Sequence, residues 1–213
     1  MWWLAARILQ APNPVAEAWR VADELDEDPT AGVLAAAIPE AAAVVVIGWP
    51  ELIGSALRRR GDLEVLVVDA LGEGTALARR LRSSLEDVVE VAESGLSAAV
   101  AASDLVLVEA LAMGEGGAVA TSGSWAAAAV ARSAGVPAWV VAGAGRVLPP
   151  PLWEALARRL DDDPEEPWER PYEVVPLDLV SQVVAPGGPE GVEAALARAD
   201  CPVAPELLRP IGA

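Results

Sequence analysis

Short apolar runs alternate with helix-like segments through the middle of the chain. The runs are rich in β-branched residues and do not alternate with polar ones, which is typical of parallel strands covered on both faces. They lie at 43–47, 63–68, 88–91, 104–109 and 135–142. Strands that alternate with helices through short connections predict right-handed crossovers and a largely parallel sheet. We therefore expect a Rossmann-like α/β fold with a mostly parallel sheet and helices on both faces.

A helical pattern replaces this alternation at the N-terminus. Val15, Trp19, Ala22 and Leu25 recur at spacings of three and four residues, which predicts an amphipathic helix. A proline-rich break at 12–14 precedes this helix, an acidic segment with a proline at 26–29 ends it, and a second helix is expected over 30–37. We expect residues 1–41 to form a short N-terminal helical segment.

The chain becomes less regular after residue 149. The pattern predicts helices over 151–160, 176–182 and 192–198, with strands over 172–175 and 183–184. Residues 161–169 are acidic and interrupted by prolines, which indicates a solvated loop; their spacing lacks the EF-hand pattern. We expect the Rossmann-like domain to span 42–185 and a C-terminal tail to span 186–213.

One stretch of the chain has the pattern of a ligand-binding βαβ unit. A buried strand at 104–109 precedes a glycine-rich loop that includes Gly116 and Gly117. A helix start at 121–124 and an alanine-rich helix follow, and then comes the next strand. Ligand sites in open α/β sheets lie at the carboxyl ends of such strands.

Polar residues follow each predicted strand. They are Gly48, Asp69, Glu93, Glu109 and the segment 143–146. Because the carboxyl ends of parallel strands meet at one edge of a sheet, we expect these residues to form a single crevice. Its three carboxylates fit a polyol or a cationic ligand better than a multiply phosphorylated one. A weak Mg²⁺ or Ca²⁺ site is the less favoured alternative.

Two features of this crevice indicate chemistry, and each has a plainer interpretation. Glu109 is a candidate general acid or base, or a partner for a ribose hydroxyl; alternatively, its carboxylate caps nearby loop amides. Thr121, Ser122, Gly123 and Ser124 begin a helix, where exposed amides and the helix dipole favour an anion, with Arg146 as the charge partner. The alternatives are an ordinary N-cap and a surface arginine.

Composition narrows the possible functions. The net charge of −17 argues against nucleic acid, because phosphate backbones are bound by clustered cations. The chain has no histidine and no lysine, and Cys201 is its single cysteine, far along the chain from the crevice. His-based catalysis, Schiff-base chemistry and cysteine-rich zinc sites are therefore excluded. No cofactor and no membrane span are expected, and the expected location is the cytoplasm.

Six segments resemble, in order and spacing, a known protein family. They are 92–94, 108–110, 114–117, 120–124, 135–137 and 172–178. This order is similar to that of the C-terminal domain of the regulatory alpha, beta and delta subunits of translation initiation factor 2B. The same family includes methylthioribose-1-phosphate isomerase and ribose-1,5-bisphosphate isomerase. The resemblance implies a Rossmann-like domain shared with sugar-phosphate isomerases and dimerisation through that domain.

The residues that would carry isomerase activity in this family differ here. The loop that holds the family's catalytic cysteine matches Gly48–Leu52, which has no cysteine. The catalytic aspartate matches Glu109, and an asparagine–lysine pair matches Ala120–Thr121. A loop whose arginine meets phosphate matches Asp69–Gly72, which has no arginine.

The sequence therefore leads to three hypotheses. The first is a factor 2B-like, non-catalytic homodimer that regulates or binds a sugar-phosphate or nucleotide-like metabolite. Its ligand would be held by Gly48, Asp69, Gly116, Gly117, Thr121, Ser122, Gly123, Ser124 and Arg146. The second is a sugar-phosphate isomerase in which Glu109 and Glu93 transfer protons. The third is a purely structural or interaction protein.

Overall fold

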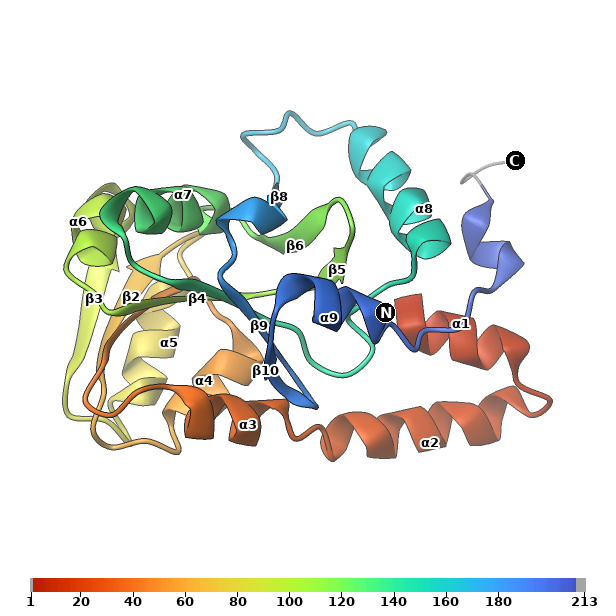
Figure 1. The fold of residues 1–213 in the computed structure, drawn as a ribbon, viewed down its shortest axis with the longest axis horizontal. Helices are drawn as coiled ribbons and strands as arrows, with labels where there is room; N and C mark the ends of the chain where they lie inside the picture. The colour runs from red at the N-terminus through yellow and green to blue at the C-terminus, as the bar shows by residue number, and fades with distance from the viewer. Residues whose placement is uncertain (1, 210–213) are drawn as a thin grey trace.

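A computed structural model describes residues 2–209 as an α/β fold built on a mostly parallel sheet (Figure 1). Within these residues the sheet has seven strands in the order β10-β9-β7-β4-β1-β2-β3, and only β10 runs antiparallel to its neighbour. The strands are β1 (Ala43–Ile47), β2 (Glu64–Asp69), β3 (Val88–Ala92), β4 (Leu105–Glu109), β7 (Ala138–Val141), β9 (Gln182–Ala185) and β10 (Gly188–Glu190). The expected fold class is confirmed.

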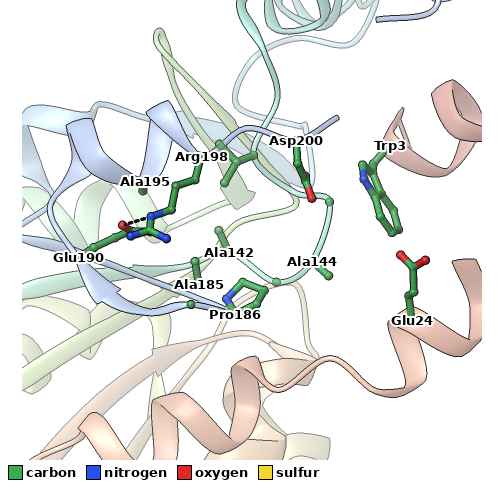
Figure 2. A pocket seen from close by; sticks show the side chains of 14 residues that line it. Trp3, Glu24, Ala142, Ala144, Ala185, Pro186, Glu190, Ala195, Arg198 and Asp200 are labelled. Carbon is green, nitrogen blue, oxygen red and sulfur yellow. Dashed lines mark ion pairs between the residues drawn. The ribbon is translucent and has the colours of Figure 1, made fainter. Parts of the chain in front are cut away.

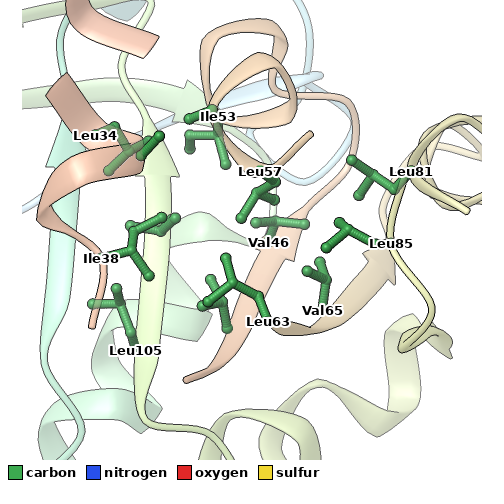
Figure 3. Close-up of a cluster of buried hydrophobic side chains, with 14 of the residues drawn as sticks. Leu34, Ile38, Val46, Ile53, Leu57, Leu63, Val65, Leu81, Leu85 and Leu105 are labelled. Carbon is green, nitrogen blue, oxygen red and sulfur yellow. The ribbon is translucent and has the colours of Figure 1, made fainter. Parts of the chain in front are cut away.

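Helices cover both faces of this sheet because successive strand residues point to opposite sides. Val44 and Val46 of β1 face α3 (Thr30–Ala37), α4 (Glu51–Leu57) and α5 (Gly74–Leu81), in the core shown in Figure 3. Val45 and Ile47 face the opposite layer. Its helices are α6 (Leu96–Ala101), α7 (Ser124–Ala134) and α9 (Val192–Ala197). Because both faces are covered, the central strands contain uninterrupted apolar runs.

The glycine-rich segment departs from the expectation. It forms a β-hairpin from β5 (Ala112–Gly114) and β6 (Gly117–Thr121), and β8 (Tyr172–Val175) adds to β6 to complete a small antiparallel sheet. A Cβ on Gly114 or Gly116 would overlap the Trp153 ring of α8 (Pro150–Asp161). The glycines are therefore needed for close packing on a tryptophan and do not form an open phosphate-type loop.

The N-terminal segment folds as α1 (Trp2–Gln10), α2 (Pro14–Asp26) and α3. The apolar stripe on α2 that predicted burial is exposed: Val15 and Trp19 are 70% and 71% accessible. Glu17 is buried on the opposite face, where it pairs with Arg7 at 2.6 Å and Arg20 at 2.8 Å. The ion pairs to α1 therefore decide which face of α2 turns inward.

The C-terminal part of the chain completes the sheet and a third core cluster. Only a single 3-10 turn, η2 (Leu177–Leu179), forms where a helix over 176–182 was expected, because β9 begins at Gln182. After α9, a second 3-10 turn, η3 (Pro205–Leu208), packs beside α1 and α8. Trp3, Trp153 and Cys201 are buried together there. The boundaries expected at residues 41 and 185 stay predictions.

One close contact in this cluster yields a test. A Cβ on Gly145, which has φ +69°, would overlap the Trp3 ring. We expect Gly145→Ala to lower the free energy of unfolding by about 3 kcal/mol, through overpacking and left-handed strain.

Gly135→Ala is the matched control for this test. Gly135 has φ +75° with nothing within 4 Å of the added carbon, so we expect a loss of only about 1 kcal/mol. Urea denaturation of both variants checks the difference, and equal losses would contradict the proposed contact.

Candidate functional site

The candidate site lies where the central strands end. β1 leads through α4 to β2 on one side, whereas β4 lies on its other side, so the strand order reverses between β1 and β4. Open α/β sheets form their ligand crevices at such a reversal, outside the carboxyl ends of the strands. Gly48, Asp69 and Glu109 end or follow the three strands concerned.

Gly48 brings the strand ends into contact. Its backbone N–H donates to the Val68 carbonyl at 3.0 Å, and its φ of +65° turns the chain sharply after β1. A Cβ at this position would lie 3.2 Å from Thr121 Cγ2 and 3.9 Å from Ala70 Cβ. The end of β1, the turn after β2 and the turn before α7 are therefore neighbours, as the expected crevice requires.

Glu109 has partners for both of its carboxylate oxygens. Oε2 accepts the backbone N–H groups of Leu52 at 2.8 Å and Ile53 at 3.1 Å, in the first turn of α4. Oε1 accepts from Arg146 Nη1 at 2.9 Å. The Glu109 side chain is only 9% accessible. It thus supplies the acceptor and the negative charge that a helix N-terminus favours.

Arg146 is committed to the same group. Its Nη1 also donates to the Ala110 carbonyl at 2.7 Å, so it is held beside the end of β4. The printed contacts of its guanidinium go to Glu109 and Ala110, and none goes to the turn at Thr121. The structure therefore uses Arg146 to neutralise Glu109.

Asp69 caps the next helix. Its Oδ1 accepts the backbone N–H of Gly74 at 2.7 Å, at the start of α5. Gly74 permits this approach, because a Cβ there would lie 2.6 Å from Asp69 Cα.

Asp28 has a similar capping role that the sequence did not reveal. It accepts from Thr30 N at 2.9 Å and from Ala144 N at 2.8 Å. Its position before a threonine that opens a helix was a capping signal for the first contact only.

The turn at 121–124 is occupied by the chain itself. Ser122 Oγ donates to the Arg170 carbonyl at 2.6 Å, and Ser124 is buried. The backbone N–H of Trp125, in the first turn of α7, donates to Glu173 Oε1 at 2.8 Å. A carboxylate of β8 therefore lies where an anionic ligand was expected. Glu173 is 48 residues away in the chain, so no local pattern could have identified it.

The remaining predicted residues lie apart from this group. Gly116 and Gly117 belong to the hairpin under Trp153 and Val174. Glu93 is exposed, just after the edge strand β3. Because β1 and β2 lie between β4 and β3, Glu93 is roughly 14 Å from Glu109 across the sheet, at about 4.8 Å per strand. Among residues 2–209, these carboxylates do not gather into a group that could hold a metal ion.

Cys201 also lies away from this site, in the third core cluster. Burial, followed by the charge of Asp200, raises the pKa of its thiol to about 11. The thiol is therefore protonated at neutral pH and is a poor nucleophile. This agrees with the interpretation of Cys201 as a structural residue.

The geometry favours binding over proton transfer. Three carboxylates at this edge, those of Glu109, Asp69 and Glu173, accept backbone amides at the starts of helices. A general base needs a free oxygen within reach of the substrate proton. Glu109 has none in this arrangement.

Comparisons with known proteins give a clear result for structure alone. Neither a protein-family model nor a curated protein matches the sequence. A translation initiation factor eIF-2B from Pyrococcus horikoshii OT3 has a TM-score of 0.73 at 14% identity, over 91% of this chain and 76% of its own. The fold is that of the factor 2B subunits.

Two further structures support this assignment of the fold. The eIF2B beta subunit from Chaetomium thermophilum has a TM-score of 0.71 at 18% identity, over 92% of this chain and 60% of its own. A 5-methylthioribose 1-phosphate isomerase from P. horikoshii OT3 has 0.63 at 18%, over 84% and 60%. The resemblance found in the sequence is thus confirmed for the fold. The chain spans three fifths of the length of these two proteins.

The role of Glu109 can be tested by its stability cost. Glu109→Gln keeps the shape of the side chain, but its amide nitrogen cannot accept a hydrogen bond, so one set of donors loses its partner. We expect the free energy of unfolding to fall by about 2 kcal/mol. Glu93→Gln, at an exposed site, should change it by less than about 0.5 kcal/mol. Equal effects in chemical denaturation would contradict the capping role.

Tyr172 on β8 gives a pH-dependent test beside this site. It is the single tyrosine of the chain. Its hydroxyl donates to the Asp163 carboxylate, and this bond, followed by burial, raises the pKa of Tyr172 above its ordinary value. The stabilisation is therefore present below pH 10 and is lost as pH rises through the folded pKa. We expect tyrosinate absorbance to show a midpoint above 10, which Asp163→Asn lowers; an unchanged midpoint would contradict the pairing.

Proposed function

We propose that this chain is a non-catalytic regulatory protein of the factor 2B type. It acts in the cytoplasm as a homodimer and binds a small metabolite of sugar-phosphate or nucleotide-like chemistry at the strand ends. The observation that carries the proposal is the full engagement of Glu109 by two backbone amides and Arg146. In the sequence resemblance, this position matches the catalytic aspartate of the isomerases.

Other matched positions support the loss of catalysis. The loop Gly48–Leu52 supplies no thiol, and the loop Asp69–Gly72 supplies no arginine for a phosphate. Neither Ala120 nor Thr121 can replace an amide and an ammonium group. What is retained is the scaffold: a strand-order reversal with its polar carboxyl edge and with Gly48 and Thr121 in contact.

The ligand is limited by the carboxylates of the chain itself. An anion reaches the first-turn amide of α7 only by displacing Glu173, so the parent protein should prefer a hydroxyl-rich ligand to one with several phosphates. Among residues 2–209 there is no helix long and apolar enough to cross a bilayer.

A thermal-shift screen against ribose phosphates, nucleotides and free sugars tests this proposal. A ligand that binds the native state raises the melting temperature with concentration. We expect stabilisation by at least one sugar-like ligand, without turnover. Glu173→Gln should strengthen the response to phosphorylated ligands because it removes the competing charge. The exposed Glu169→Gln is the matched control and should leave the response unchanged. No response to any ligand would contradict metabolite binding and favour a structural or interaction role.

The isomerase remains the competing hypothesis, with Glu109 and Glu93 as its acid and base. Their separation across two intervening strands argues against it, because one small substrate does not reach both groups. Turnover of a phosphorylated sugar by the parent protein, lost in Glu109→Gln with binding retained, would support the isomerase and contradict the proposal.

The dimer is proposed to form over the same edge of the sheet. Leu71 and Leu111, each 56% accessible, follow β2 and β4, and Trp125, 48% accessible, begins α7. Large apolar side chains gathered on one surface mark interaction sites in soluble proteins. A solved structure with this fold is a tetrameric complex of eIF2B beta and delta subunits from C. thermophilum.

We expect light scattering to give the mass of a dimer. Trp125→Glu should shift it to a monomer, because a buried charge at an apolar interface is costly. Trp168→Glu is the control, since Trp168 is 80% accessible in the acidic loop, away from this edge. A monomeric parent protein, or the same mass for both variants, would contradict this interface.

A further inference from the structure

A cavity of about 320 Å³ lies at the carboxyl ends of β7 and β9 (Figure 2). This volume is at the lower end of the range for small-molecule sites. Its walls come from parts of the chain far apart in sequence: α1, α2, the loop after β7, the turn between β9 and β10, and the segment after α9. None of the residues predicted as site residues lines it.

The charged groups around the cavity leave a negative excess. Glu24 is already paired, since both of its oxygens accept from Arg7, which lowers the pKa of Glu24. Glu190 pairs with Arg198, with 2.8 Å between Oε2 and Nε. Asp200 also lines the cavity and has no ion-pair partner in the described part of the chain. One carboxylate charge is therefore without a counter-ion.

One buried acceptor in this cavity is also without a partner. Glu190 Oε1 is shielded from solvent and, among residues 2–209, accepts no hydrogen bond. Leaving a buried charged acceptor without a donor costs stability, so the site favours a molecule that supplies an N–H group. Arg198 does not meet this need, because its Nε is bound to the other oxygen and its side chain is 70% accessible at the rim.

The rest of the lining is small and apolar. Figure 2 shows the Glu190–Arg198 pair on one side of the cavity and Asp200 with Trp3 on the other. Between them lie the side chains Ala142, Ala185 and Pro186. The indole of Trp3 is packed against Gly145 and Arg7 and is a wall of the cavity, with its faces covered. The distance between the acidic groups is thus bridged by a surface that suits a short hydrocarbon chain.

We propose that this cavity binds a small organic cation, a primary amine or guanidinium on a short aliphatic body. The cation donates to Glu190 Oε1 and neutralises Asp200, and its methylene groups cover Ala142 and Pro186. An anion is excluded by the same two carboxylates. This goes beyond the function proposed for the strand ends, because the residues and the ligand charge are different.

Isothermal titration calorimetry with agmatine and putrescine tests the proposal, with butanediol as the neutral analogue and succinate as the anionic one. We expect saturable binding of the two amines alone, weakened by added salt. Glu190→Gln and Asp200→Asn should each raise the dissociation constant about tenfold, the effect of one lost charged hydrogen bond. Asp200 is exposed, so its variant is expected to fold normally even where Glu190→Gln does not.

Glu193→Gln separates a specific site from general attraction to an acidic protein. Glu193 is exposed on α9, carries the same charge and lies outside the cavity. We expect it to leave amine binding unchanged. Equal weakening by Glu193→Gln and Asp200→Asn, binding of butanediol as tight as that of putrescine, or no heat with either amine would each overturn the proposal. Those results would not affect the sugar-phosphate screen, whose residues are separate.

Discussion

Several parallel strands of this sheet end beside the start of a helix, and the amide groups exposed there need acceptors. The chain provides these acceptors itself, at three of its helices. Glu109 serves α4, Asp69 serves α5 and Glu173 serves α7. This use of its own carboxylates decides what the carboxyl edge can do. Positions where related folds could receive an anionic ligand are filled from within the molecule, and the arginine nearest to the edge is used to balance Glu109.

The same constraint explains how so acidic a chain can fold compactly. A net charge of −17 opposes the folded state through self-repulsion. Carboxylates that accept backbone amides at helix starts are stabilised by the helix dipole and need no arginine of their own. The few arginines then remain for places where a charge is deeply enclosed, such as Glu17 between Arg7 and Arg20.

The central sheet could be predicted because its signal is local. Val44 to Ile47 is a β-branched run that fits only a strand covered on both faces, and its neighbours repeat that pattern. The site was harder to predict, since its decisive contacts join distant residues. Gly48 and Asp69 were placed correctly at one edge, whereas the partner of Trp125 lies 48 residues later. The hairpin at 112–121 was missed because its glycines looked like a ligand loop until Trp153 was seen against them. The stripe on α2 was read with the correct period and the wrong face, since ion pairs to α1 outweighed it.

The cluster that unites Trp3 and Ala6 with Cys201 and Ala204 has a consequence for biosynthesis. Its first contributors leave the ribosome about two hundred residues before its last. At typical rates of ~5–20 residues per second, α1 waits for roughly 10–40 seconds without its partners. During that interval Trp2 and Trp3 form an exposed aromatic pair at the leading end of the nascent chain. Closing so long a loop late makes this cluster the slow step of assembly and the place where a chaperone has most to protect.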